Sequence, residues 1–218
     1  LKYIAFVYDS PQVKLYSYTV TYPTNYIFLF DSELVHQFQQ EGITTFYYMP
    51  LPVDANKITM LLSKSYNQKR LSADVSFVGS LYNEEHNLYD NLKNLSDYTK
   101  GFLDGILKAQ SQVYGYNFMQ ECLTPSILRL FKSDPNISVG LCQNMGPADY
   151  LSETPYIFHN SKINLNFTLR SIRSGIPLRC MEIMASGGFL LTNFQADLLQ
   201  HFTPNEDFVY FESINERL

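Results

Sequence analysis

The chain has 218 residues, of which 45% are hydrophobic and 15% aromatic, and its formal net charge is −5. This length allows one large domain or two small ones, and the acidic balance excludes the broad basic surface of a nucleic-acid-binding protein. The odd number of cysteines argues against a disulfide framework and favours a reduced, cytoplasmic setting, and no apolar run reaches the roughly 18 residues of a membrane span.

The N-terminal quarter has the pattern of a parallel α/β unit. Three short apolar runs rich in β-forming residues predict strands at residues 3–8, 26–30 and 44–49. Between the second and third runs, SELVHQFQQE predicts a helix that is capped by Asp31 or Ser32 and ends at Gly42. Short connections between strand, helix and strand indicate parallel pairing.

Residues 50–57 (PLPVDANK) interrupt this pattern, because two prolines favour an extended connector. We expect a domain boundary here. The expected division is an N-terminal domain at 1–55, a linker at 56–73 and a second domain at 74–218. The chain begins inside a strand-like run without Met and stops at a helix start, so we expect the N-terminal domain to be incomplete.

Residues 74–79 (DVSFVG) predict the first strand of the second domain, and it ends at Gly79 and Ser80. A helix is expected from residue 83, and the pattern over residues 85–132 is mostly helical. Residues 136–142 are compatible with a strand or with a poor helix end.

The most informative segment is residues 161–193. It predicts an apolar strand, a polar and basic loop, a helix at 176–187 opened by Pro177 and stopped by two glycines, and a further strand at 189–192. QADLLQHF then predicts a short amphipathic helix, and residues 207–211 (DFVYF) predict the last strand.

An anion would suit the start of the helix at 176–187. The first N–H groups of a helix have no partner within it, and its dipole places positive charge there. Arg170 and Arg173 precede this point and could neutralise a diphosphate leaving group. Glu182 lies about 7–8 Å further along the axis, within reach of ribose hydroxyls. The alternatives are a solvated basic loop and a solvated helix-face carboxylate.

Other candidates follow strands. Gly79 and Ser80 would let a ligand approach the backbone closely, although a glycine at a strand end is by itself better explained by a simple turn. Asp9 and Asp31 follow the first two strands and could act as a general base or orient a hydroxyl. Asp31 is the better helix cap and Asp9 the better catalytic candidate, with a turn role for Asp9 as the alternative. The histidines and cysteines show no metal-ligand spacing, so no metal site is expected.

The series GIPLRCMEIMASGGFLLTNFQADLLQHF, followed by DFVYFES, resembles the C-terminal domain of glycosyltransferases with the GT-B architecture. The likeness is strongest to the bacterial CgeB-type, spore-maturation-like group. Upstream, YDSPQ, NYIFLFD and YMPLPVD resemble the end of the N-terminal domain of these proteins. The resemblance implies an α/β fold with two Rossmann-like domains, whose parallel sheets face a cleft.

The resemblance also implies roles for residues. Glu182 matches the glutamate that takes the ribose hydroxyls, and the residues around Gly175 match the loop that receives the diphosphate. We therefore expect donor contacts from the set Gly79, Ser80, Ser174, Gly175, Ile176, Arg179 and Glu182, and catalytic roles for Asp9, Arg170 and Arg173. The family needs no bound metal. Many retaining relatives carry a second glutamate eight positions before Glu182, where this chain has Ser174.

The expected function is that of a cytoplasmic bacterial glycosyltransferase of the metal-independent, hexosyl-transferring type. It would move a sugar from a nucleotide-diphosphate donor to an unidentified acceptor. Two alternatives stay open at this point: a non-catalytic nucleotide or nucleotide-sugar binding module, and a two-domain sensor for a small anionic ligand.

Overall fold

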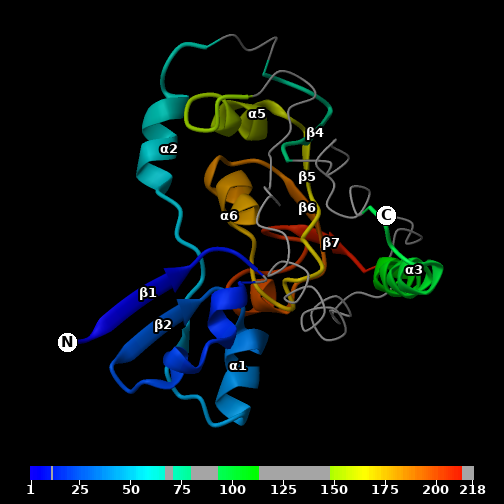
Figure 1. Cartoon of the computed structure of the whole chain (residues 1–218). Helices are drawn as coiled ribbons and strands as arrows, with labels where there is room; N and C mark the ends of the chain where they lie inside the picture. Colours follow the sequence, from blue (N-terminus) through cyan, green and yellow to red (C-terminus); the bar gives the residue numbers. More distant parts are fainter. Residues whose placement is uncertain (11, 67–70, 80–92, 113–147, 213–218) are drawn as a thin grey trace. The chain divides into compact units, whose positions relative to one another are not determined.

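The computed structural model describes residues 1–10, 12–66, 71–79, 93–112 and 148–212. The chain divides into two compact units, one formed by Leu1–Val78 with Ala148–Leu218 and the other by Gly79–Pro147. The first unit contains two β-sheets, and every strand pair in them is parallel (Figure 1). The α/β class with parallel sheets that the sequence predicts is therefore confirmed.

The first sheet has the strand order β1-β2-β3, with β1 at Tyr3–Val7, β2 at Asn25–Leu29 and β3 at Phe46–Tyr48. These are the three strands predicted from the apolar runs. Helix α1 (Ser32–Gln40) connects β2 to β3, as the sequence pattern predicts. The Asp31 side chain caps α1 by accepting a hydrogen bond from the Leu34 N–H at 3.1 Å.

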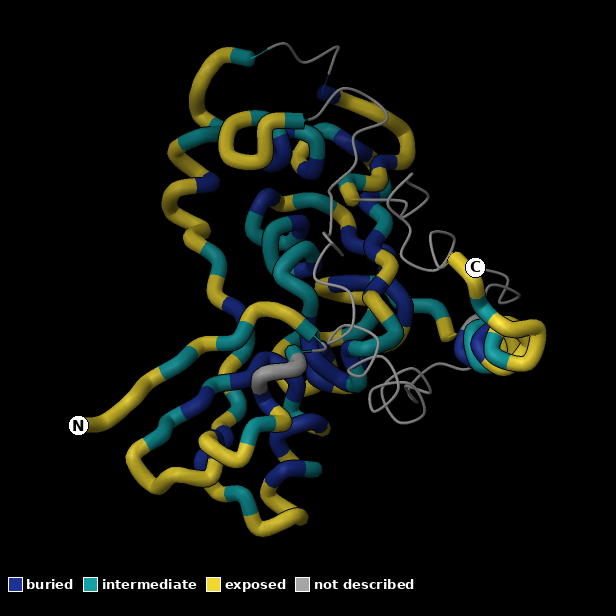
Figure 2. Tube along the Cα trace, in the orientation of Figure 1, coloured by how far each residue is buried: buried dark blue, intermediate teal, exposed yellow. Residues whose placement is uncertain are grey.

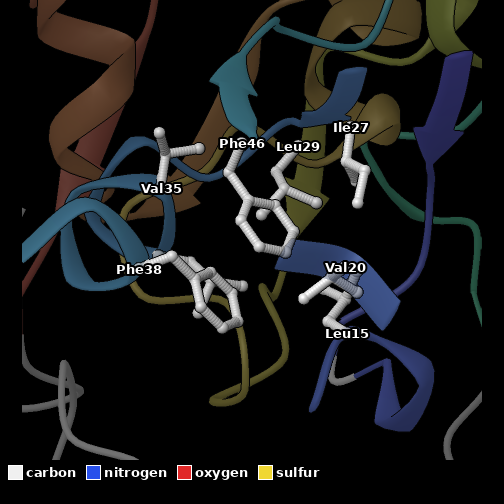
Figure 3. Close-up of a cluster of buried hydrophobic side chains, with 8 residues drawn as sticks. Leu15, Val20, Ile27, Leu29, Val35, Phe38 and Phe46 are labelled. Atoms are coloured by element: carbon white, nitrogen blue, oxygen red, sulfur yellow. The ribbon is translucent and has the colours of Figure 1, made fainter. Parts of the chain in front are cut away.

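The core of the first sheet lies on the face that α1 covers (Figure 3). Ile27 and Leu29 project to the same face because side chains alternate along a strand. The rings of Phe38 and Phe46 stack with their centroids 4.1 Å apart. Two 3₁₀ turns, at Val13–Tyr16 and Tyr18–Thr21, complete the core. Its buried members are Leu15, Val20, Ile27, Leu29, Leu34, Val35, Phe38 and Phe46.

Helix α2 (Ala55–Leu62) follows the proline-containing connector. The Asp54 side chain caps it by accepting a hydrogen bond from the Lys57 N–H at 2.9 Å. Both prolines precede this cap, so they do not interrupt the helix. The range expected as a linker, residues 56–73, thus includes most of α2, which the sequence reading did not predict. The domain limits at residues 55 and 73 stay a prediction.

The second sheet has the order β4-β5-β6-β7, at Val75–Phe77, Ile163–Asn166, Leu190–Asn193 and Val209–Phe211. Each strand falls within or next to an apolar run that the sequence indicates. All four residues of β6 are buried, as expected for a strand inside a parallel α/β sheet. Figure 2 shows how burial varies along the chain.

Two helices and a 3₁₀ turn accompany the second sheet: α5 (Thr154–Asn160), α6 (Leu178–Ala185) and η4 (Ala196–Gln200). The sequence reading missed α5, and QADLLQHF forms the 3₁₀ turn where a helix was expected. Burial raises the pKa of the Cys180 thiol to about 12, so this cysteine is an apolar core residue. The core consists of Phe158, Ile176, Cys180, Ile183, Leu190, Leu198 and Phe208.

The end of α6 shows why two glycines follow it. Gly187 has φ +70°, its N–H bonds to the Met184 carbonyl at 2.9 Å, and the Gly188 N–H bonds to the Ile183 carbonyl at 3.0 Å. This is a Schellman motif, which requires a left-handed residue at the first of the two positions. Gly188 serves another purpose, because a Cβ there would lie 2.5 Å from the Phe158 carbonyl oxygen.

We expect Gly188→Ala to lower the free energy of unfolding by about 2 kcal/mol, because the added methyl group overpacks a rigid contact. The nearest atom is a backbone carbonyl oxygen, which cannot rotate away. Gly105→Ala in α3 is the control, since nothing lies within 4 Å of its Cβ position, and alanine there should stabilise by about 0.5–1 kcal/mol. Urea unfolding of both variants measures the difference. A Gly188→Ala chain that was as stable as wild type, or more stable, would contradict the contact.

The described part of the Gly79–Pro147 unit contains helix α3 (Asp97–Gln112). Residues 93–96 are not helical and Asn94 has φ +62°, so the helix predicted from residue 83 does not run on into α3. The other expected elements here, at residues 80–92 and 113–147, lie outside the described residues. Over the described ranges, no helix is long and apolar enough to cross a membrane.

Candidate functional site

Helix α6 begins at Leu178, two residues later than the sequence predicts. Pro177 stands at the N-cap position with extended backbone (φ −59°, ψ 143°), and its side chain makes no capping hydrogen bond. The fixed φ of proline suits a helix start. The Cys180 N–H bonds to the Pro177 carbonyl at 3.0 Å, so the N-cap residue supplies a backbone acceptor but no side-chain acceptor to the first turn.

Glu182 lies on the second turn of α6, and its side chain is 13% exposed. One carboxylate oxygen, Oε2, accepts a hydrogen bond from Nη1 of Arg179 at 3.0 Å. The other, Oε1, accepts one from the hydroxyl of Tyr150. The Arg179 guanidinium also lies over the rings of Tyr150 and Phe158, 5.9 and 5.4 Å from their centroids. Glu182 is thus a half-enclosed carboxylate held by one cation and one phenol.

The phenol is the proton donor in this contact. Burial raises the pKa of Tyr150 to about 12, and the adjacent Glu182 carboxylate adds to the increase, while Arg179 opposes it. At neutral pH, Tyr150 therefore keeps its proton and donates a hydrogen bond to Glu182.

Glu182 and Tyr150 line a hollow of about 560 Å³. One wall comes from α6 and α5, and the opposite wall comes from the connector before α2 and from α2 itself, which contacts α5. This volume is within the usual range for small-molecule sites. The lining combines apolar side chains with a few charged ones, namely Asp54, Lys57, Lys64 and Glu182.

A second polar group forms where the loop before α6 meets the end of β2. Asp31 and Ser174 are both buried, and the Ser174 hydroxyl donates to Oδ1 of Asp31 at 3.0 Å and accepts from the Glu33 N–H at 3.0 Å. Gly175 is packed so closely that a Cβ would lie 2.7 Å from the Phe30 carbonyl oxygen. The hydrogen-bonding groups of Ser174 are therefore used inside the protein.

The same loop contacts the end of β1. Ser10 and Ser171 exchange hydrogen bonds, each hydroxyl donating to the other's carbonyl, at 2.9 and 2.7 Å. Asp9 is exposed and precedes Ser10 directly, whereas Arg170 and Arg173 are half-buried and flank this contact. The structure thus brings the three residues predicted to be catalytic to neighbouring positions.

The described lining of the hollow contains Glu182 but none of Asp9, Arg170, Arg173 or Ser174. The residues predicted from the sequence therefore lie in two places. Glu182 lies on the second turn of α6, whereas Asp9, Arg170, Arg173 and Ser174 lie in or next to the loop before that helix. Ile176, also predicted for the donor site, is fully buried in the core. Gly79 is exposed directly after Val78, and Ser80 lies outside the described residues.

Sequence reasoning missed Tyr150 and the wall formed by α2. Tyr150 stands 32 positions before Glu182, and nothing in its local pattern separates it from the other 16 tyrosines. A helical reading of residues 55–62, with Asp54 as the cap, would have indicated α2.

One comparison with known proteins bears on this site. Residues 132–218 match the model of a protein family described as glycosyl transferase-like. The match covers less than half of the chain. It includes β5, α6, β6 and β7, together with Glu182 and the loop that carries Arg170 and Arg173. No curated protein and no solved structure matches the chain.

Among the described residues, no group of three or more His, Cys, Asp or Glu side chains could hold a metal ion.

Proposed function

We propose that this protein transfers a sugar from a nucleoside-diphosphate donor to an acceptor, and that Glu182 binds the ribose of the donor. The observation that carries the proposal is a half-enclosed carboxylate beside a hollow of about 560 Å³, inside the segment that matches a glycosyl transferase-like family. A carboxylate can accept hydrogen bonds from both ribose hydroxyls at once.

The diphosphate is assigned to the start of α6. Helix rise is about 1.5 Å per residue, so Glu182 lies roughly 6 Å along the axis from Leu178. That separation suits a ribose bound at Glu182 and phosphates bound at the uncapped first turn. Arg170 and Arg173 are proposed to stabilise the negative charge that develops on the departing diphosphate.

This arrangement fits the two facing Rossmann-like domains of the GT-B architecture and the CgeB-type group that the sequence resembles. Asp9 is proposed as the group that orients or deprotonates the acceptor hydroxyl, since it is exposed beside the loop that carries Arg170 and Arg173. The chemistry assigned to these residues needs no metal ion.

A second candidate is a nucleotide-binding module without transferase activity. It is favoured by one observation: the Ser174 hydroxyl is engaged by Asp31, at the position where many retaining enzymes of the group that the sequence resembles carry a second glutamate. A buried serine in that state cannot contact a transferred sugar as a glutamate would.

The test is a titration of the chain with UDP-, GDP- and ADP-sugars by calorimetry, with release of the nucleoside diphosphate followed in parallel. Binding of one nucleotide class together with donor turnover is the expected result. Tight binding without turnover on any acceptor would establish the binding module instead, and no binding to any member of the panel would contradict both.

A further inference from the structure

Tyr150 occupies one oxygen of the carboxylate that is assigned to the ribose. Its hydroxyl donates to Oε1 of Glu182, and a ribose hydroxyl would donate the same kind of hydrogen bond to the same atom. Arg179 holds the other oxygen, Oε2, at 3.0 Å. When a ribose approaches Glu182 from the hollow, both carboxylate oxygens therefore already accept a hydrogen bond from the protein.

The backbone around Tyr150 is fixed independently of this contact. Asp149 accepts hydrogen bonds from the N–H groups of Leu151 and Ser152 at 3.0 and 2.8 Å, and its own N–H bonds to Glu153 at 3.0 Å. These bonds hold the turn before α5. The side chain of Tyr150 can therefore rotate away from Glu182 while the turn keeps its structure.

The position of Tyr150 leaves room for this rotation. The residue is 49% exposed, and it lines the hollow together with Glu182. Apart from the hydroxyl contact, its ring meets the guanidinium of Arg179 at 5.9 Å. Such a cation–π contact can be re-formed with the ring of a nucleobase, since both present a π-face.

We propose that the Tyr150 hydroxyl stands in for a ribose hydroxyl on Glu182, and that a ribonucleotide binds by displacing it. Tyr150 then sets how tightly the site holds a ribose, because every ribonucleotide competes with an internal donor. This inference rests on the proposed function. It adds a residue that determines affinity for the sugar of the nucleotide and that the sequence did not indicate.

The opposite role for Tyr150 would be to orient Glu182 for the ligand. The two roles predict opposite signs. If Tyr150 competes, its removal raises the fraction of chains with a free Oε1, and the apparent dissociation constant falls in proportion. If Tyr150 orients the carboxylate, its removal weakens binding.

The experiment is calorimetric titration of wild type and Tyr150→Phe with UDP, GDP and ADP and with their 2′,3′-dideoxy counterparts. We expect Tyr150→Phe to bind the ribonucleotide about three- to tenfold more tightly, as loss of a competing hydrogen bond from a half-exposed side chain predicts. The dideoxy nucleotide has no hydroxyl to place on Glu182, so its affinity should change less than twofold. Tyr98→Phe, at a position that is 83% exposed in α3, is the matched control.

A second readout follows Tyr150 directly. Wild-type chain with 3-fluorotyrosine at position 150 should show a shifted ¹⁹F resonance on addition of the ribonucleotide and an unshifted one with the dideoxy analogue. Equal or weaker ribonucleotide binding by Tyr150→Phe would overturn the inference and leave the proposed function standing. An absence of nucleotide binding by wild type and variant alike would overturn both.

Discussion

Replacing Asp31 by alanine should lower the free energy of unfolding by about 3 kcal/mol, the largest loss of stability that we expect from one substitution. The carboxylate is 1% exposed. It accepts hydrogen bonds from the N–H groups of Leu34 and Arg173, at 3.1 and 2.6 Å, and from the Ser174 hydroxyl at 3.0 Å. Each buried donor left without an acceptor costs about 1–3 kcal/mol, and loss of a helix cap costs about 1 kcal/mol.

Asp54→Ala is the matched control for this prediction. Asp54 also caps a helix, α2, but it is exposed and accepts only the Lys57 N–H at 2.9 Å among the hydrogen bonds described. Its loss should cost about 1 kcal/mol. The midpoints of urea unfolding measure both effects. If the two variants were equally destabilised, the buried network between Asp31 and the loop before α6 would not contribute as we argue.

Glu182→Ala should weaken nucleoside-diphosphate binding by about ten- to a hundredfold, the largest expected change in affinity. A hydrogen bond to a charged acceptor contributes about 1.5–3 kcal/mol, and each 1.4 kcal/mol changes the dissociation constant tenfold. Titration calorimetry with UDP, GDP and ADP measures the effect. Glu182→Gln keeps the volume and one oxygen acceptor, so its loss of affinity should be smaller.

The control for this substitution is Glu41→Ala, which removes an exposed glutamate at the end of α1 and should leave nucleotide affinity unchanged. Thermal unfolding of each variant shows whether the fold is retained. A folded Glu182→Ala chain that bound nucleotides as tightly as wild type would remove Glu182 from the site.

The parts of the fold that were predictable from the sequence are those in which local pattern and tertiary role agree. Strand β2 lies in the apolar run YIFLF, and β6 begins with two leucines that continue the run from Phe189. Such runs are typical of strands in parallel sheets. Helix α1 combines an N-cap at Asp31 with a left-handed Gly42 (φ +82°) after its end, and both signals were recognised. The two glycines after α6 were likewise identified as the end of that helix.

Helices α2 and α5 were not predicted, because their local sequence patterns indicate other structures. Helix α5 has seven residues, and its TPYIFHN sequence is rich in β-forming side chains. Its stability depends on burial of residues such as Phe158, which is 1% exposed, and such packing does not appear as a local pattern. Helix α2 follows two prolines, and a pair of prolines is more typical of an extended connector than of a helix start.

The candidate site was predictable in part. The spacing between a helix start and a carboxylate is a local property, so the sequence alone indicates Glu182 and the start of α6 as candidates, and their role stays a prediction. Tyr150 and α2 reach the hollow from distant positions in the chain, so no spacing rule indicates them. Ser174 was expected to contact the ligand, yet its hydroxyl bonds to Asp31, a residue 143 positions earlier. Only the folded chain reveals that partner.

The most direct test of the central claim is a cycle that pairs the carboxylate of Glu182 with the hydroxyls of the ribose. Affinities are measured for a nucleoside diphosphate and its 2′,3′-dideoxy counterpart, each with wild type and with Glu182→Gln. If Glu182 binds the ribose, removal of the hydroxyls should weaken binding to wild type about tenfold and to the variant less than about twofold. An equal loss in both proteins would show that the ribose hydroxyls do not meet Glu182, and would contradict the assignment of the donor site.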